Sequence, residues 1–359
     1  MAVRARTRPT GPRVDEHGVD FAFPSPRGGV AAVHLAPTLS RGVRGTAFAL
    51  RGRTWRLRFP RPPVDRFEYQ LALEHQDGGT ELICDPGNPL TAPGPFGEKS
   101  VIEFPGYSPP AWLDAEPPPG DAVETTVWSR PFRRDVEVAV WASPGAEPGK
   151  PLPLLVVHDG PETVKYTGLL HLLAHVVASG DLPPLRAALL TPFDRNDTYS
   201  ASAAWARTLA WDVLPGIVDV APTPHRRRMR VAMGASLGGL AALHVHRRHP
   251  ELFGGLFLQS GSFFRARTDR HEAGFPRFDR ISRFVGRVLR GADEVEPVDV
   301  TITCGAAEEN LANNRAVARA LREQGYEVRF VENRDAHTWI GWRDTYDPWL
   351  LELLRRKWG

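Results

Sequence analysis

The pentapeptide Gly234-Ala-Ser-Leu-Gly238 decides how the whole chain is interpreted. It fits the pattern G-x-S-x-G, in which a serine occupies a cramped turn between a strand and a helix. Glycines two positions before and after the serine relieve the crowding, because they carry no Cβ. The surroundings agree, since residues 230–233 suit a buried strand and residues 240–249 suit a helix. The pattern predicts Ser236 as a nucleophile; the alternative is a glycine-rich turn with an inert serine.

Around this turn, short apolar runs alternate with segments of helical periodicity. A hairpin is expected over 125–128 and 136–141. Further strands are expected over 152–157, 187–190, 230–233, 256–258, 298–304 and 327–331, and helices over 169–178, 203–220, 240–249, 313–324 and 348–357. Strands alternating with helices imply a parallel sheet covered on both faces. Together with the serine turn, this predicts an α/β-hydrolase fold over residues 123–359.

The N-terminal third has a different pattern. Residues 45–50 and 54–59 alternate between apolar and polar side chains, and residues 66–74 form a clear period-two strand. Proline and glycine interrupt these runs, and no segment has helical periodicity of useful length. We therefore predict an all-β sandwich over 19–113, preceded by a disordered arm over 1–18. A proline-rich linker is expected over 114–122.

Bulk composition narrows the choice of partners. A net charge of +3, from 45 Lys and Arg against 42 Asp and Glu, is too small to indicate nucleic acid. The chain has no run of 18 apolar residues, so we expect no membrane span. The basic N-terminus lacks a following apolar segment, so we expect no secretory signal and a cytoplasmic location. Cys84 and Cys304 are expected to be reduced thiols, and no metal or cofactor motif is present.

The general base should come from a late loop, because this fold orders its triad as serine, acid, histidine along the chain. Three histidines lie on or beside the helix that follows Ser236, where they are poorly placed to face back to it. His271 lies in an arginine-rich insertion. His337 follows the strand over 327–331 in a loop, which is where the last strand delivers the base, and we predict His337 in that role.

The acid should follow the preceding strand. Residues 298–304 lead into Gly305-Ala-Ala-Glu-Glu309, so that Glu308 and Glu309 are both candidates. A carboxylate there can accept a hydrogen bond from His337 Nδ1 and fix the tautomer of the ring.

The oxyanion hole needs two backbone N–H donors. The first is expected from Leu237, the residue after the nucleophile. The second should come from the loop after the strand over 152–157, which contains Gly160, Pro161 and Glu162. Because proline has no N–H, the donor must be Gly160 or Glu162.

With these pieces in place, the chain resembles the enterochelin (ferric-enterobactin) esterase group of the esterase D-type putative esterases. The resemblance covers nearly the whole chain. It rests on the Ser236 turn, His337 and nine further stretches: Phe67-Glu-Tyr69, Asp85-Pro-Gly-Asn-Pro89, Phe96-Gly-Glu-Lys-Ser-Val101, His158-Asp-Gly160, Arg195-Asn-Asp-Thr-Tyr199, Gln259-Ser-Gly-Ser-Phe-Phe264, Cys304-Gly-Ala-Ala-Glu308, Asn314-Arg315 and Trp342-Arg-Asp344. It implies that the β module is an immunoglobulin-like domain of the early-set type, and that Glu308 is the triad acid. Pro161 departs from the family, which often has a residue with an N–H at that position.

The resemblance also implies an activity. It indicates hydrolysis of a carboxylic ester through an acyl-enzyme, the substrate being a siderophore lactone, iron-loaded and anionic. Arg265 and Arg267 are then expected to attract the anionic substrate, and Trp339 to stack on an aryl ring. One alternative is an esterase for carbohydrate or feruloyl esters, or an acyltransferase, with Trp55 and Tyr69 of the β module holding a glycan. Another is a non-catalytic binding protein with a decayed site.

Overall fold

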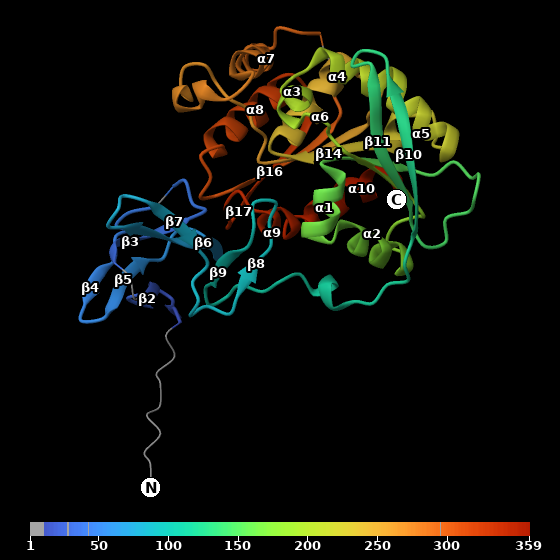
Figure 1. Cartoon of the computed structure of the whole chain (residues 1–359). Helices are drawn as coiled ribbons and strands as arrows, with labels where there is room; N and C mark the ends of the chain where they lie inside the picture. Colours follow the sequence, from blue (N-terminus) through green and yellow to red (C-terminus); the bar gives the residue numbers. More distant parts are fainter. Residues whose placement is uncertain (1–10, 27–28, 42, 295) are drawn as a thin grey trace. The chain divides into compact units, whose positions relative to one another are not determined.

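The computed structural model divides into two compact units (Figure 1). It describes residues 11–26, 29–41, 43–294 and 296–359. The β unit comprises the chain up to residue 108 together with residues 305–309 and 333–341. The α/β unit comprises residues 109–304, 310–332 and 342–359. Two short segments near the C-terminus therefore belong, by their contacts, to the β unit.

The β unit is built from two antiparallel sheets. The first has the order β1-β2-β5-β4, and the second has the order β3-β6-β9-β8 with β7 paired to β6. Phe21 of β2 and Phe67 of β6 share one hydrophobic core, because alternate side chains of each strand point to the same face. The strands are β1 Arg13–Asp15, β2 Gly18–Pro24, β3 Val30–Pro37, β4 Ala49–Arg51, β5 Thr54–Pro60, β6 Arg66–His75, β7 Thr80–Ile83, β8 Thr91–Ala92 and β9 Lys99–Glu103.

The N-terminal arm differs from the prediction. Arg13–Asp15 forms β1, which pairs antiparallel with β2, and β2 begins at Gly18. The predicted disordered arm over 1–18 therefore does not extend over its last residues, because residues 13–15 find a partner strand that their own composition did not indicate. Residues 1–10 lie outside the described residues.

The α/β unit contains an eight-stranded mixed sheet of order β10-β11-β13-β12-β14-β15-β16-β17. β10 and β11 form an antiparallel hairpin, β11 is antiparallel to β13, and the strands from β13 through β16 run parallel. Val156 packs in one core cluster and Val157 in a second, so apolar side chains cover both faces of the sheet. The strands are β10 Asp121–Ser129, β11 Arg134–Ala142, β12 Leu154–His158, β13 Arg186–Leu190, β14 Arg230–Ala235, β15 Gly255–Gln259, β16 Asp299–Gly305 and β17 Glu327–Asn333.

The helices agree with the predicted alternation, with four additions, of which α9 (Trp339–Arg343) is one. The predicted helix over 203–220 is α4 and α5 joined by a π-helical turn, and α1, α3, α7 and α9 were not predicted. The helices are α1 Gly160–Thr167, α2 Leu169–Ala178, α3 Arg195–Tyr199, α4 Ala203–Thr208, α5 Leu214–Val220, α6 Leu237–Arg248, α7 Phe278–Arg290, α8 Leu311–Glu323, α9 Trp339–Arg343 and α10 Leu351–Trp358. Within the described part of the chain, none of the helices has the length and apolar character needed to cross a bilayer.

Candidate active site

Ser236 occupies a strained turn between β14 and α6. Its φ and ψ are 57° and −120°, a combination that non-glycine residues rarely adopt and that stores backbone strain. A Cβ on Gly234 would lie 2.5 Å from the carbonyl carbon of Gly238, so the turn closes only because that side chain is absent. The Ser236 N–H donates to the Gln259 carbonyl oxygen at 2.8 Å, which ties the turn to β15. This is the geometry predicted from the pentapeptide.

A second hydroxyl lies against Ser236. The Oγ atoms of Ser236 and Ser262 are 3.1 Å apart, and the Ser262 N–H donates to the Ser236 carbonyl oxygen at 3.1 Å. Asn314 fixes the neighbouring Gly261, since its side-chain amide bonds both the N–H and the carbonyl of that residue at 3.0 Å. No local pattern predicted a role for Ser262, although it lies in the stretch Gln259–Phe264 directly after β15.

Two helix N-termini supply candidate oxyanion donors in the α/β unit. Leu237 opens α6, and Gly160 opens α1. The first N–H groups of a helix have no intrahelical acceptor, so both are available to an anion. The turn before α1 is held by Asp159, whose φ is 52° and whose two carboxylate oxygens each accept from Arg195 at 2.8 Å.

The structure brings His337 and Glu308 together in the β unit. His337 Nδ1 lies 2.8 Å from Glu308 Oε2, and the other carboxylate oxygen accepts from the Gly305 N–H at 2.8 Å. Glu308 is buried, with 2 % of its surface exposed, whereas the His337 side chain is 36 % exposed. A buried carboxylate in this position holds the proton on Nδ1 and leaves Nε2 as the basic nitrogen. Glu309 is exposed.

Comparison with known proteins identifies the family. A family model described as "Putative esterase" matches residues 129–353. The chain belongs to this esterase family. It is 27 % identical over 299 residues to the iron(III) enterobactin esterase of Dickeya dadantii, covering 79 % of this chain and 68 % of the relative. It is 28 % identical over 292 residues to the Escherichia coli K12 enzyme of the same name, covering 78 % and 70 %.

Solved structures of such enzymes share the fold of this esterase. The ferric enterobactin esterase of Salmonella typhimurium matches with a TM-score of 0.78 at 20 % identity over 98 % of both chains. The enterobactin esterase of Shigella flexneri, crystallised in the presence of enterobactin, matches with a TM-score of 0.76 at 19 % identity over 98 % of this chain and 97 % of its own. A ferulic acid esterase matches less closely, with a TM-score of 0.57 at 18 % identity, over 67 % of this chain and 99 % of its own.

In this esterase, the predicted substrate residues belong to both units. Arg265 and Arg267 lie in the α/β unit, in a turn where the Arg265 N–H donates to Asp269 Oδ2 at 2.6 Å. Arg267 is exposed and Arg265 is half-buried. Trp339 lies in the β unit, at the start of α9, and is half-buried.

The suggestion that Trp55 and Tyr69 of the β unit hold a glycan is wrong. Trp55 has 6 % and Tyr69 has 0 % of its surface exposed, and both lie in the hydrophobic core. The Tyr69 hydroxyl donates to Asp85 Oδ2 at 2.9 Å. Neither ring is accessible to a sugar, because both fill the space between the two sheets.

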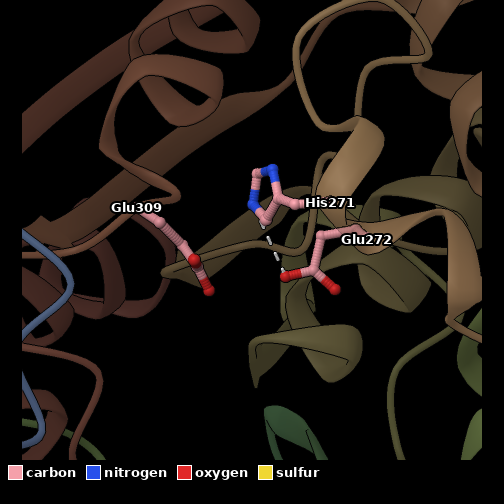
Figure 2. A group of neighbouring side chains, drawn as sticks. All are labelled: His271, Glu272 and Glu309. Carbon is pink, nitrogen blue, oxygen red and sulfur yellow. Dashed lines mark ion pairs between the residues drawn. The ribbon is translucent and has the colours of Figure 1, made fainter.

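Two other histidines, His271 and His158, have contacts that do not involve the Glu308–His337 pair. His271 pairs with Glu272 at 3.8 Å on a short 3-10 turn of the α/β unit (Figure 2), whereas Glu309, also drawn there, belongs to the β unit. His158 is fully buried, and burial lowers its pKa to about 4, so the ring is neutral. Its Nδ1 bonds the Met233 carbonyl at 3.1 Å directly below the Ser236 turn, so it supports β14.

Proposed function

We propose that this protein is a serine esterase that cleaves the ester bonds of an enterobactin-like siderophore. The observation that carries the proposal is the hydrogen bond between His337 Nδ1 and Glu308 Oε2, in a chain that also holds Ser236 in a strained turn. Curated relatives that align over almost four fifths of this chain are iron(III) enterobactin esterases. We infer the substrate class from the name of these relatives, and the reaction chemistry from the residues of this chain.

In the proposed reaction, His337 Nε2 takes the proton of the Ser236 hydroxyl while Oγ bonds the ester carbonyl carbon. Glu308 keeps the other ring proton on Nδ1 and stabilises the imidazolium. The N–H groups of Leu237 and Gly160 bind the oxyanion of the tetrahedral intermediate. The ester C–O bond then breaks, the leaving alkoxide takes the proton from His337, and water hydrolyses the acyl-enzyme by the same steps in reverse.

Substrate recognition is proposed for Arg265, Arg267 and Trp339. An iron-loaded catecholate siderophore is anionic and aromatic, so it offers charge to guanidinium groups and a flat ring to an indole. With Trp55 and Tyr69 buried, the β unit loses the two residues that supported a carbohydrate substrate.

We also infer the domain organisation from the two sheets of the β unit. Their shared core fits an immunoglobulin-like sandwich over residues 19–113. The predicted linker over 114–122 would then end where β10 begins, at Asp121, and lead into the catalytic domain predicted over 123–359.

The test uses the full chain, a fluorophosphonate probe and a catecholate trilactone with and without iron. We expect the probe to label the wild type and not Ser236→Ala, and we expect the wild type to open the trilactone. Ser262→Ala serves as the matched control for the end point of labelling: it removes a neighbouring hydroxyl but leaves Ser236 in place, so it should still label fully. Hydrolysis of nitrophenyl esters without trilactone cleavage would contradict the siderophore substrate. An unlabelled, inactive wild type would contradict the esterase itself.

A further inference from the structure

The segments that carry Glu308 and His337 pack as part of the β unit. Ala307 and Ala336 are fully buried members of the same hydrophobic core as the two sheets. The Ser40 N–H donates to the Ala307 carbonyl at 3.0 Å, and the Asp65 N–H donates to the Arg334 carbonyl at 2.8 Å. The backbone next to Glu308 and the backbone of the His337 loop are therefore hydrogen-bonded to residues that flank β3 and β6.

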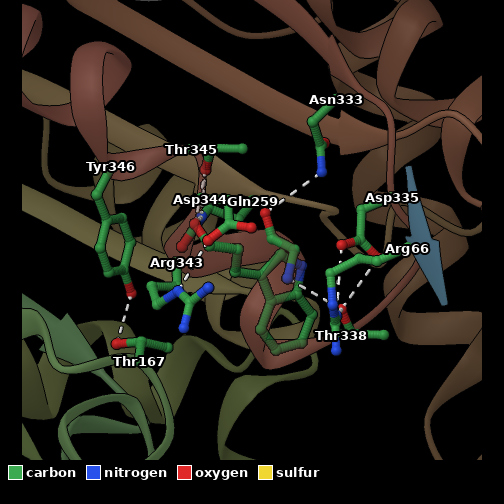
Figure 3. Close-up of polar contacts among 12 residues, drawn as sticks. Arg66, Thr167, Gln259, Asn333, Asp335, Thr338, Arg343, Asp344, Thr345 and Tyr346 are labelled. Atoms are coloured by element: carbon green, nitrogen blue, oxygen red, sulfur yellow. Dashed lines mark hydrogen bonds and ion pairs between the residues drawn. The ribbon is translucent and has the colours of Figure 1, made fainter. Parts of the chain in front are cut away.

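Arg66 is the charged group at the centre of this attachment (Figure 3). It is the first residue of β6, and only 2 % of its surface is exposed. Its guanidinium donates to Glu68 Oε1 at 3.3 Å, to Asp335 Oδ2 at 3.4 Å and to Thr338 Oγ1 at 3.4 Å. Removing a guanidinium from water costs free energy, which its hydrogen bonds must offset. The groups that accept those hydrogen bonds are therefore held firmly.

Asp335 and Thr338 pass this restraint to the backbone of the histidine loop. Asp335 Oδ1 accepts from the Ala336 N–H at 2.6 Å and from the Thr338 hydroxyl at 3.2 Å. Thr338 Oγ1 in turn accepts from the Gly341 N–H at 3.0 Å. His337 lies between Ala336 and Thr338, so the residues on both sides of it are bound to one cluster, centred on Arg66.

The histidine needs such support because its own ring is exposed. The His337 side chain is 36 % exposed, and its Nδ1 is hydrogen-bonded to Glu308 Oε2 at 2.8 Å. A second link between the same segments, from Arg334 to Asp65 at 2.9 Å, involves side chains that are 55 % and 31 % exposed. Exposed pairs restrain little, since water competes for both partners. The buried cluster is the stronger restraint.

We propose that Arg66 is a positioning residue for the general base: it fixes the loop from Asp335 to Thr338 and so keeps the His337 imidazole on Glu308. The inference rests on the proposed function, in which His337 acts as the base. It gives the β unit a part in catalysis through the loop that it holds.

The test compares Arg66→Met, Arg66→Lys and a matched control, Arg58→Met, in the full chain. Arg58 lies on β5 of the same unit and pairs with Asp15 and Asp20 at exposed positions. Because small misplacements of a catalytic group lower rates steeply, we expect Arg66→Met to lower kcat by about 100-fold with KM within about twofold of the wild type. Arg66→Lys keeps the buried charge and is expected to recover part of that loss, and Arg58→Met to change neither constant.

A proton NMR readout separates positioning from general damage. The His337 Nδ1–H resonance is identified by its loss in His337→Gln, and we expect it to disappear or shift in Arg66→Met and to persist in Arg58→Met. If Arg66→Met keeps both its kcat and this resonance, the positioning role is wrong. It is also wrong if kcat falls while the resonance is unchanged.

Two further outcomes remain decisive. If Arg66→Met does not fold, Thr338→Val is judged by the same criteria, since it removes the hydroxyl that accepts from Arg66 and from the Gly341 N–H. If the wild type hydrolyses no ester, the proposed function fails, and the resonance alone decides whether Arg66 orders the histidine.

Discussion

Replacing Gly160 with alanine tests the oxyanion loop, because the structure leaves no room for a methyl group there. A Cβ on Gly160 would lie 2.4 Å from the Cα and 2.5 Å from the Cβ of Leu189. Ordinary contacts begin near 3.4 Å, so the helix start must move by about 1 Å relative to β13. Leu189 belongs to a strand in the middle of the sheet, so the displacement falls on the loop that carries Gly160.

A displacement of that size takes a backbone donor out of hydrogen-bond range. Losing one oxyanion donor raises the barrier by about 2.7–4 kcal/mol, so we expect kcat to fall by about 10²–10³-fold. KM should change little, because the donor bonds the oxyanion and not the ground-state ester. The assay is steady-state hydrolysis of a nitrophenyl ester, with thermal unfolding recorded alongside.

Gly274→Ala is the matched control, since a Cβ at that position meets no atom within 4 Å. A folded Gly160→Ala protein whose kcat stays within about threefold of the wild type would refute the reasoning, because an oxyanion donor contributes far more than that. Glu162 would then be the remaining candidate donor in this loop.

Two further predictions concern single side chains near the Ser236 turn. Ser262→Ala removes the hydroxyl that lies 3.1 Å from Ser236 Oγ. Because a neutral hydrogen bond contributes about 1 kcal/mol, we expect fluorophosphonate labelling of this variant to slow by about fivefold. An unchanged labelling rate would show that this contact does not orient Ser236. Burial lowers the pKa of His158 from 6.5 to about 4. Between those pH values the unfolded chain therefore binds more protons at this residue than the folded chain does. The free energy of unfolding falls as the pH drops from 6.5 towards 4. The shift corresponds to about 3 kcal/mol, and urea unfolding should show a flatter pH dependence in His158→Gln than in the wild type.

Local patterns predicted the elements that surround Ser236. The glycines of the pentapeptide and the apolar runs on either side are local signals, and β14 and α6 form where they indicate. Two of the helices that were not predicted, α1 and α7, have local signals that resemble loops. α1 contains Pro161 near its start, and α7 is interrupted by arginines, although Phe278, Ile281 and Val285 keep a helical spacing on its buried face.

The hydrogen-bonded pair of Glu308 and His337 shows the limit of local patterns. Residue types alone left Glu308 and Glu309 open, since both follow β16 and both are acidic. In the folded chain, Glu308 turns back to the Gly305 N–H and is buried, whereas Glu309 is exposed. The contact of Arg66 could not be predicted either, because its partner Asp335 lies 269 positions further along the chain and no local pattern joins the two.

Pro161, the residue that first raised doubt about the site, is accounted for by the start of α1. It is the second residue of that helix, where a backbone N–H has no intrahelical acceptor, so the helix loses no hydrogen bond to the proline. Proline also fixes φ near the helical value and so helps to begin α1 directly after Gly160. Because Pro161 cannot donate, the Gly160 N–H is the first backbone donor at the N-terminus of α1. The residue that departs from the family pattern therefore fits a helix start that supports the proposed oxyanion hole.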